Sequence, residues 1–176
     1  MTKNSPLLIL AITTSMIAAG FALEKLKVSL NFIIEFSGKL SNYDHISPSE
    51  RENQLASFRR NSPSDYYHSH NPIEIFYGFN RGELIWVKWA VVVLALLGFY
   101  CLNALTLSLV LRDQSYKGLL NWLYVMVICL GAIFFAIERS FFADNHTAAV
   151  SRKILAAGQS GIPGIIVLLM YKLRLQ

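Results

Sequence analysis

The chain has 176 residues, of which 54% are apolar and only 15% charged, and its mean hydropathy of +0.42 excludes an ordinary water-soluble domain. A net charge of +5 on so apolar a chain favours orientation signals and lipid headgroup contacts over nucleic-acid binding. The only cysteines, Cys101 and Cys129, lie in apolar runs without CxxC or Cys/His spacing. We therefore expect buried, unreactive thiols and neither a redox pair nor a zinc site.

Four stretches of the sequence are long and apolar enough to cross a bilayer. A span needs about 20 mostly apolar residues, because a helix rises about 1.5 Å per residue through about 30 Å of hydrocarbon. The stretches are residues 7–23, 84–111, 119–137 and 154–171. The sequence predicts an all-α membrane protein, a single membrane domain over residues 1–176. Its four transmembrane helices would have a long polar extramembrane loop, residues 24–83, between the first two.

The first stretch has a second interpretation as a signal peptide. Gly20, Phe21 and Ala22 loosely fit the small-x-small pattern of a cleavage site. The apolar helical pattern continues past that point through Leu26 and Leu30. We favour a retained anchor that extends into an interfacial helix, with a cleaved signal as the alternative.

The long polar loop contains two segments with a local structural signal. In SPSERENQLASFRR, Ser47 or Ser49 can cap a short helix that carries acidic residues first and basic residues last. In NPIEIFYG, Asn71 and Pro72 form a turn or helix-start signal before an aromatic cluster. We expect that cluster to form an interfacial helix at the membrane surface, just before the second span.

Between these two segments lies a weak metal-binding pattern. Asp65, His68 and His70 approach one another if the chain there is extended, because alternate residues then share a face. A solvated turn is the commoner structure for such a sequence. We therefore predict no metal and no cofactor.

The fourth apolar stretch differs from the others because glycines and a proline interrupt it. Gly158, Gly161 and Gly164 surround Gln159 and Pro163. A proline inside a helix frees a backbone carbonyl one turn earlier, and glycines allow another helix to approach closely. The sequence predicts a kink packed against a neighbouring helix. The segment is either a docking face for a larger membrane protein or the element that closes a four-helix bundle.

Polar residues within the spans, such as Asn103, are explained by hydrogen bonds between helices or by contact with a partner. The sequence contains no nucleophile paired with a base, no mid-membrane carboxylate pair, no HExxH motif and no phosphate-binding glycine loop, so we predict no enzyme. The residues for which we expect a partner interface are Asn71, Pro72, Asn103, Gly158, Gln159, Gly161, Pro163 and Gly164. Lysine and arginine counts in the short segments favour both termini in the cytoplasm.

From Asn71 onward the order of features resembles the small membrane proteins associated with exosortases in bacteria of the Bacteroidetes type. The resemblance lies in NPIEIFYG before a span, in FYCLNALTLSLVLRDQSYKGLLNWLYV with its charged turn, and in RKILAAGQSGIPGIIVLLMYKL as the last span. Asn71 departs from the aspartate expected there, and the first loop is longer than in the family.

The resemblance implies a non-catalytic accessory protein, multi-pass in the bacterial inner (cytoplasmic) membrane. Such a protein would bind or position an exosortase-like membrane partner, a protease-transpeptidase that processes sorted surface proteins, or its substrate. The partners would then be the lipid bilayer and that larger membrane protein. The alternative is a small subunit of a membrane transporter or channel complex, for which paired broken helices or mid-span charges are expected.

Overall fold

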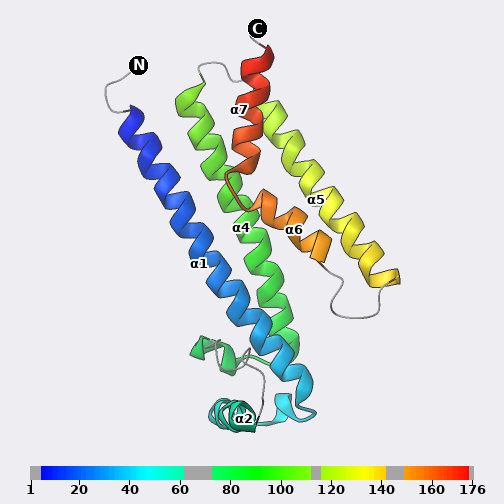
Figure 1. Cartoon of the computed structure of the whole chain (residues 1–176). Coiled ribbons are helices and arrows are strands. Elements are labelled where there is room, and N and C mark those ends of the chain that lie inside the picture. Colours follow the sequence, from blue (N-terminus) through cyan, green and yellow to red (C-terminus); the bar gives the residue numbers. More distant parts are fainter. Residues whose placement is uncertain (1–4, 62–72, 112–115, 142–148, 175–176) are drawn as a thin grey trace. The chain divides into compact units, whose positions relative to one another are not determined.

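The computed structural model in Figure 1 describes residues 5–61, 73–111, 116–141 and 149–174. Within these ranges every regular element is a helix. The α-helices are α1 (Ser5–Lys39), α2 (Pro48–Asn61), α4 (Arg81–Val110), α5 (Tyr116–Phe141), α6 (Ala149–Gly158) and α7 (Ile162–Arg174), and the 3-10 helices are η1 (Tyr43–His45) and η2 (Glu74–Gly78). The predicted all-α class is confirmed.

Three helices are long and apolar enough to cross a membrane, at Leu7–Lys39, Arg81–Val110 and Tyr116–Ile137. Large apolar side chains are exposed on their outer faces. Leu94, for example, has 67% of its surface exposed. Such faces are stable against lipid and not against water. By length and composition, the described residues form a membrane protein. The fourth predicted stretch is a pair of helices, α6 and α7, bent by 66° at a break.

The first helix is longer than the predicted first span. It continues without interruption to Lys39, as the helical pattern past Ala22 predicted, so the polar loop begins after residue 39 and not at residue 24. The apolar residues Leu30, Ile33 and Phe36 recur at helical spacing, and all three are fully buried. Their burial explains why the helix extends beyond the length that hydrocarbon requires.

The chain divides into two compact units. One, here called the broken-helix unit, comprises Met1–Gly20 and Leu94–Gln176; the other, here called the loop unit, comprises Phe21–Val93. We describe each unit by itself.

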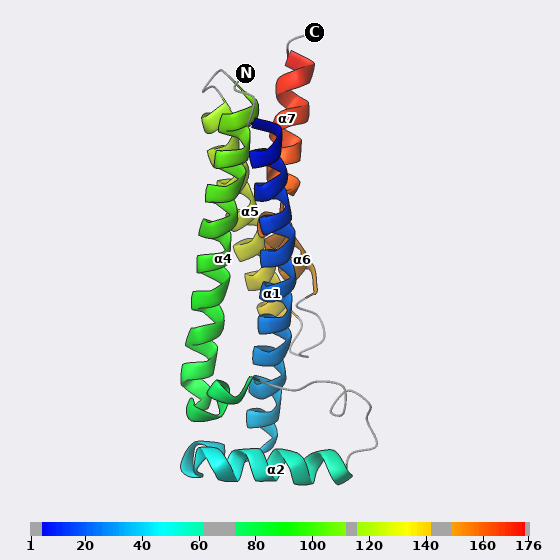
Figure 2. The ribbon, with the colours of Figure 1, turned by 90° about the vertical axis from the view of Figure 1, so that its left-hand side faces the viewer.

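The loop unit has its own apolar core. Figure 2 shows α2 lying across the C-terminal end of α1. The buried core residues come from both helices, from η1 and η2, and from the start of α4: Leu30, Phe32, Ile33, Phe36, Tyr43, Leu55, Phe76, Tyr77 and Leu84. Phe76 and Tyr77, expected as membrane-surface anchors, are instead 5% and 7% exposed within this core. The segment predicted as an interfacial helix is the short 3-10 helix η2.

Side-chain caps fix where the helices of this unit begin. The Glu50 N–H donates to Ser47 Oγ at 3.3 Å, so Ser47 caps α2 as one of the two predicted candidates. At the start of α4, the Asn80 N–H donates to Glu83 Oε2 at 2.7 Å, one half of a capping box. The Arg81 N–H donates to Asp44 Oδ1 at 2.8 Å. These acidic partners explain why α4 starts before the first residue of the predicted span.

Candidate functional site: the broken helix

The interruption between α6 and α7 is a full break rather than a bend in one helix. Helix α6 ends at Gly158 and α7 begins at Ile162. Pro163 is therefore in the first turn of α7, where a missing N–H and a fixed φ favour helix initiation. The predicted kink is confirmed by the 66° bend, but Pro163 starts the second helix instead of distorting a continuous one.

Ser160 satisfies one backbone group on each side of the break. Its hydroxyl donates to the Ala157 carbonyl at 2.6 Å, at the end of α6. The same oxygen accepts the Ile162 N–H at 3.1 Å, at the start of α7. In hydrocarbon there is no water to replace these bonds, so non-helical backbone is stable only when the protein supplies them. One small side chain thus bonds to both helix ends.

Asn103 on α4 ties the break to the neighbouring helix. The side chain is 2% exposed, and its Nδ2 donates to the Ser160 carbonyl at 2.9 Å and to the Phe99 carbonyl at 2.9 Å. The Tyr124 hydroxyl of α5 lies 3.0 Å from the same nitrogen. Two carbonyls around one side-chain atom require that atom to be the nitrogen, which fixes the orientation of the amide.

An aromatic pair extends this network towards α5. The Tyr100 and Tyr124 rings form an edge-to-face pair with centroids 5.2 Å apart, and the Tyr100 hydroxyl donates to Asn121 Oδ1 at 2.6 Å. Asn103, Tyr124 and Ser160 therefore link α4, α5 and the α6–α7 break. The arrangement holds an irregular backbone in one geometry.

The glycines at the break have different roles. A Cβ on Gly158 would lie 2.8 Å from Val127 Cγ1, and one on Gly164 would overlap Asn103 Oδ1. A Cβ on Gly161 would meet only Met16 Cε, at an ordinary 3.6 Å. Gly158 and Gly164 are thus required for close packing within the unit, whereas Gly161 borders open space.

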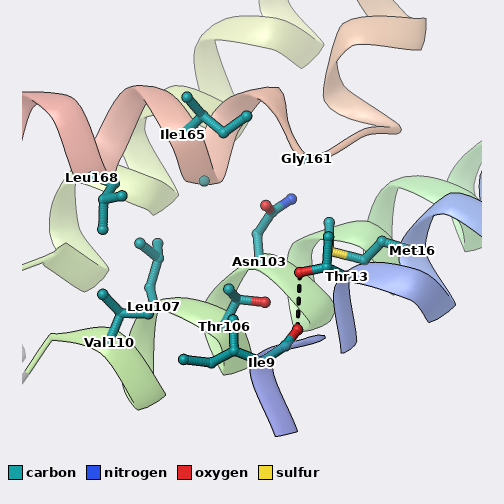
Figure 3. A pocket seen from close by; sticks show the side chains of 11 residues that line it. Ile9, Thr13, Met16, Asn103, Thr106, Leu107, Val110, Gly161, Ile165 and Leu168 are labelled. Atoms are coloured by element: carbon teal, nitrogen blue, oxygen red, sulfur yellow. Dashed lines mark hydrogen bonds between the residues drawn. The ribbon is translucent and has the colours of Figure 1, made fainter. Parts of the chain in front are cut away.

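That open space is a cavity of about 250 Å³ between α1, α4 and α7, here called the α1–α4–α7 cavity. Figure 3 shows Thr13 and Asn103 facing it from α1 and α4. Its described lining residues are Ile9, Thr13, Met16, Asn103, Thr106, Leu107, Val110, Gly161, Gly164, Ile165 and Leu168. A second hollow of about 360 Å³ adjoins it and shares Thr13, Met16, Gly161 and Ile165.

Six of the residues expected at a partner interface meet at this break. Asn103, Gly158, Gln159 and Pro163 are buried in the unit, while Gly161 and Gly164 are half-buried and line the cavity. Asn71 and Pro72 lie outside the described residues, as do Asp65, His68 and His70. Among the residues that the structure describes, no cluster of His, Cys, Asp or Glu suits a metal ion.

A second buried polar site, which the sequence did not indicate, lies in the loop unit around Arg51. The Arg51 side chain is 3% exposed. Its Nε donates to the Tyr43 carbonyl at 3.0 Å, and its Nη1 donates to the carbonyls of Tyr77 and Phe79 at 2.7 and 2.9 Å. Nη2 donates to Asn80 Oδ1 at 3.2 Å. The guanidinium thereby joins α2 to the segment that leads into α4.

Tyr43 packs directly against this guanidinium. Arg51 Cζ lies 4.4 Å from the centre of the Tyr43 ring, a cation–π contact. The Tyr43 hydroxyl is buried without a hydrogen-bond partner among the described residues. Burial raises the pKa of Tyr43 above its usual value, and the nearby positive charge of Arg51 opposes part of that rise.

The two cysteines do not occupy the buried positions expected for them. Cys101 and Cys129 are both exposed on the surfaces of α4 and α5. A membrane helix is apolar on its lipid-facing side as well as on its packed side, so an apolar run does not predict burial.

Comparison of the chain with protein families, curated proteins and solved structures found no match. The class that the fold defines is an all-α membrane protein with a discontinuous helix beside a half-open cavity.

Proposed function

We propose that this protein is a non-catalytic accessory protein of an exosortase-type protein-sorting system, which binds or positions the enzyme or its substrate. The resemblance of the chain from Asn71 onward supports this proposal. The structural observation that carries it is that Asn103 and Ser160 donate their side-chain hydrogen bonds to backbone carbonyls of the broken-helix unit. Polar groups used in this way build a fixed scaffold.

In the same proposal, α6 and α7 together form one broken span, which gives four crossings of the bacterial inner membrane. The shallow excess of lysine and arginine in the short segments supports cytoplasmic termini. The loop unit then faces the outer side, where sorted surface proteins are processed.

The buried residues at the break have an indirect role in this proposal. Asn103, Gly158 and Gln159 are enclosed within the broken-helix unit. They shape the scaffold and do not themselves touch the enzyme. Loss of the scaffold would weaken binding of the enzyme through the altered course of α7.

The deciding experiment is affinity purification of the tagged full-length chain from its native membranes, with mass-spectrometric identification of associated proteins. We expect an exosortase-type enzyme to co-purify, and we expect Asn103→Leu to reduce its yield. Thr14→Val is the matched control, because the Thr14 hydroxyl bonds only to the Leu10 carbonyl of its own helix. Purification without such an enzyme, together with normal processing of sorted proteins in a deletion strain, would overturn the proposal.

One observation favours the alternative, a small subunit of a transporter or channel. Discontinuous membrane helices commonly build substrate and ion sites, and here a break at Gly158–Ile162 adjoins a cavity. No charged side chain is among the described residues that line that cavity, which disfavours an ion pathway. Solute or ion flux into proteoliposomes that contain the purified protein would support this alternative.

A further inference from the structure

The α1–α4–α7 cavity presents hydrogen-bond acceptors from its side chains, but their donors are already used. The Thr13 hydroxyl donates to the Ile9 carbonyl at 2.9 Å, and the Thr106 hydroxyl donates to the Leu102 carbonyl at 2.8 Å. The Asn103 Nδ2 is engaged at the break. What these three side chains still offer is oxygen lone pairs.

The Asn103 Oδ1 is the acceptor that matters most. It lies beside Gly164 at the cavity wall, and no described residue donates a hydrogen bond to it. An amide oxygen without a donor is costly in an apolar medium, because water does not supply one there. A ligand with an N–H or O–H group would remove that cost.

The rest of the described lining limits the ligand to an uncharged apolar molecule. Apolar side chains such as Leu107, Ile165 and Leu168 form the wall, and none of the described lining residues is charged. A charged group would be left unpaired there. The volume of about 250 Å³ exceeds the roughly 150 Å³ of an engineered cavity that binds benzene.

The distance of Asn103 from the end of α4 further limits the class of ligand. Val110, the last residue of α4, also lines the cavity, and Asn103 lies seven residues before it. At about 1.5 Å per residue, Asn103 is about 10 Å from that helix end. A neutral alcohol is far less costly to place at such a depth than a phosphate headgroup.

We propose that the α1–α4–α7 cavity binds a neutral, hydroxyl-bearing lipid whose hydroxyl donates to Asn103 Oδ1 and whose chain packs against Leu107, Ile165 and Leu168. This inference goes beyond the proposed function and does not depend on it. The two proposals can fail separately. Alcohol binding without a co-purified enzyme would overturn only the proposed function, and a co-purified enzyme without alcohol binding would overturn only this inference.

The test uses full-length protein in phosphatidylcholine nanodiscs with a photoreactive long-chain primary alcohol as the probe. The matched probe is its methyl ether, which has the same chain and no donor. Mass spectrometry then measures labelling of the α1, α4 and α7 peptides. We expect the alcohol to label these peptides roughly three- to tenfold more than the ether, the range for one net hydrogen bond. Equal labelling by both probes would overturn the proposal.

Variants test the location of the ligand without breaking the network of Asn103. Gly161→Leu fills the cavity, because a side chain there meets only Met16, and should reduce labelling by both probes. Gly98→Leu is the control, since Gly98 on α4 has nothing within 4 Å of its Cβ position. Thr13→Val with Thr106→Val should leave the excess of alcohol over ether in place, because the proposed acceptor is Asn103 Oδ1 and not a threonine hydroxyl. Unchanged labelling of Gly161→Leu would also overturn the proposal.

Discussion

Arg51 in the loop unit and Asn103 in the broken-helix unit perform the same task in different surroundings. Each is almost completely buried, and each donates hydrogen bonds to backbone carbonyls that lie outside the α-helices. Arg51 does so with a charged guanidinium from α2, a helix that is polar along most of its length. Asn103 does so with a neutral amide from α4, within a stretch apolar enough to span a membrane.

The difference shows how the surrounding medium selects the side chain. A guanidinium offers several donors in a fixed fork, which suits the four acceptors around Arg51. An arginine at the centre of a membrane helix costs about 2.5–3.5 kcal/mol on insertion scales. The amide of Asn103 supplies fewer donors without a charge. The break presents one carbonyl to Asn103, that of Ser160, and can be held by that smaller group.

The largest expected effect comes from removing the guanidinium. Arg51→Met should destabilise the loop unit by at least about 3 kcal/mol, because it leaves several buried acceptors without donors. Hydrogen exchange of the amides from Ile73 to Leu84, in detergent or nanodiscs, would measure the loss of protection. Arg51→Lys should recover only part of it, since an ammonium lacks the planar fork.

Arg60→Met is the matched control, because Arg60 is on the same helix and is exposed. The same exchange pattern in the Arg51 and Arg60 variants would contradict the structural role of Arg51.

The next largest effect distinguishes two glycines, Gly161 in the break and Gly164 in α7. Gly164→Ala should destabilise the broken-helix unit by about 1–3 kcal/mol, the usual range for overpacking, because its Cβ overlaps Asn103 Oδ1. Gly161→Ala has ordinary contacts and should have little effect. Thermal unfolding of the two variants in the same detergent would measure this difference. Equal melting temperatures would show that Asn103 moves aside freely.

A smaller loss is expected from Asn103→Leu, about 1–2 kcal/mol, as for other polar contacts between membrane helices. The loss should appear as faster exchange of the amides that follow Ser160, because the Ser160 carbonyl loses its donor. Ser108→Ala on the same helix serves as control, since the Ser108 hydroxyl bonds only to the Leu105 carbonyl of its own helix. Indistinguishable amide exchange in the two variants would contradict the role of Asn103 in holding the break.

The smallest effect depends on pH and belongs to the loop unit. The folded state raises the pKa of Tyr43, so the unit holds that proton more tightly than the unfolded chain does. This stabilisation is present below the ordinary tyrosine pKa of about 10 and is lost as the pH rises through the folded pKa. Tyr43→Phe should abolish the pH dependence above about pH 10 and cost little at neutral pH, because the hydroxyl has no partner.

Unfolding of the loop unit followed from pH 8 to pH 11 would measure this difference. If the Tyr43→Phe variant loses as much stability at alkaline pH as the wild type, a group other than Tyr43 causes that loss.

Local signals in the sequence were sufficient for much of the fold. The Ser47 cap and the acidic first turn predicted α2, and uninterrupted apolar runs predicted the spans in α4 and α5. Glycines and a proline predicted an interruption near residue 160. In each case the information lies within one or two helical turns of the feature.

The two polar sites could not be predicted in the same way. Arg51 is bonded to carbonyls 26 and 28 residues away, and Asn103 to one 57 residues away. A carbonyl is present in every residue, so an acceptor leaves no mark on the sequence. The core of the loop unit was missed for a related reason, because its apolar residues are spread over five separate helices. Only the tertiary structure brings them together.

The exposed thiols of Cys101 and Cys129 provide native reporters of membrane topology. They are the only cysteines in the chain, and one lies on α4 and the other on α5. If both helices cross the bilayer, each thiol faces hydrocarbon, where it stays protonated and does not react as a nucleophile, so a maleimide should leave both unmodified in membranes and modify them once the protein is unfolded in detergent. The position of each helix relative to lipid can thus be measured on the wild-type protein, without an introduced label.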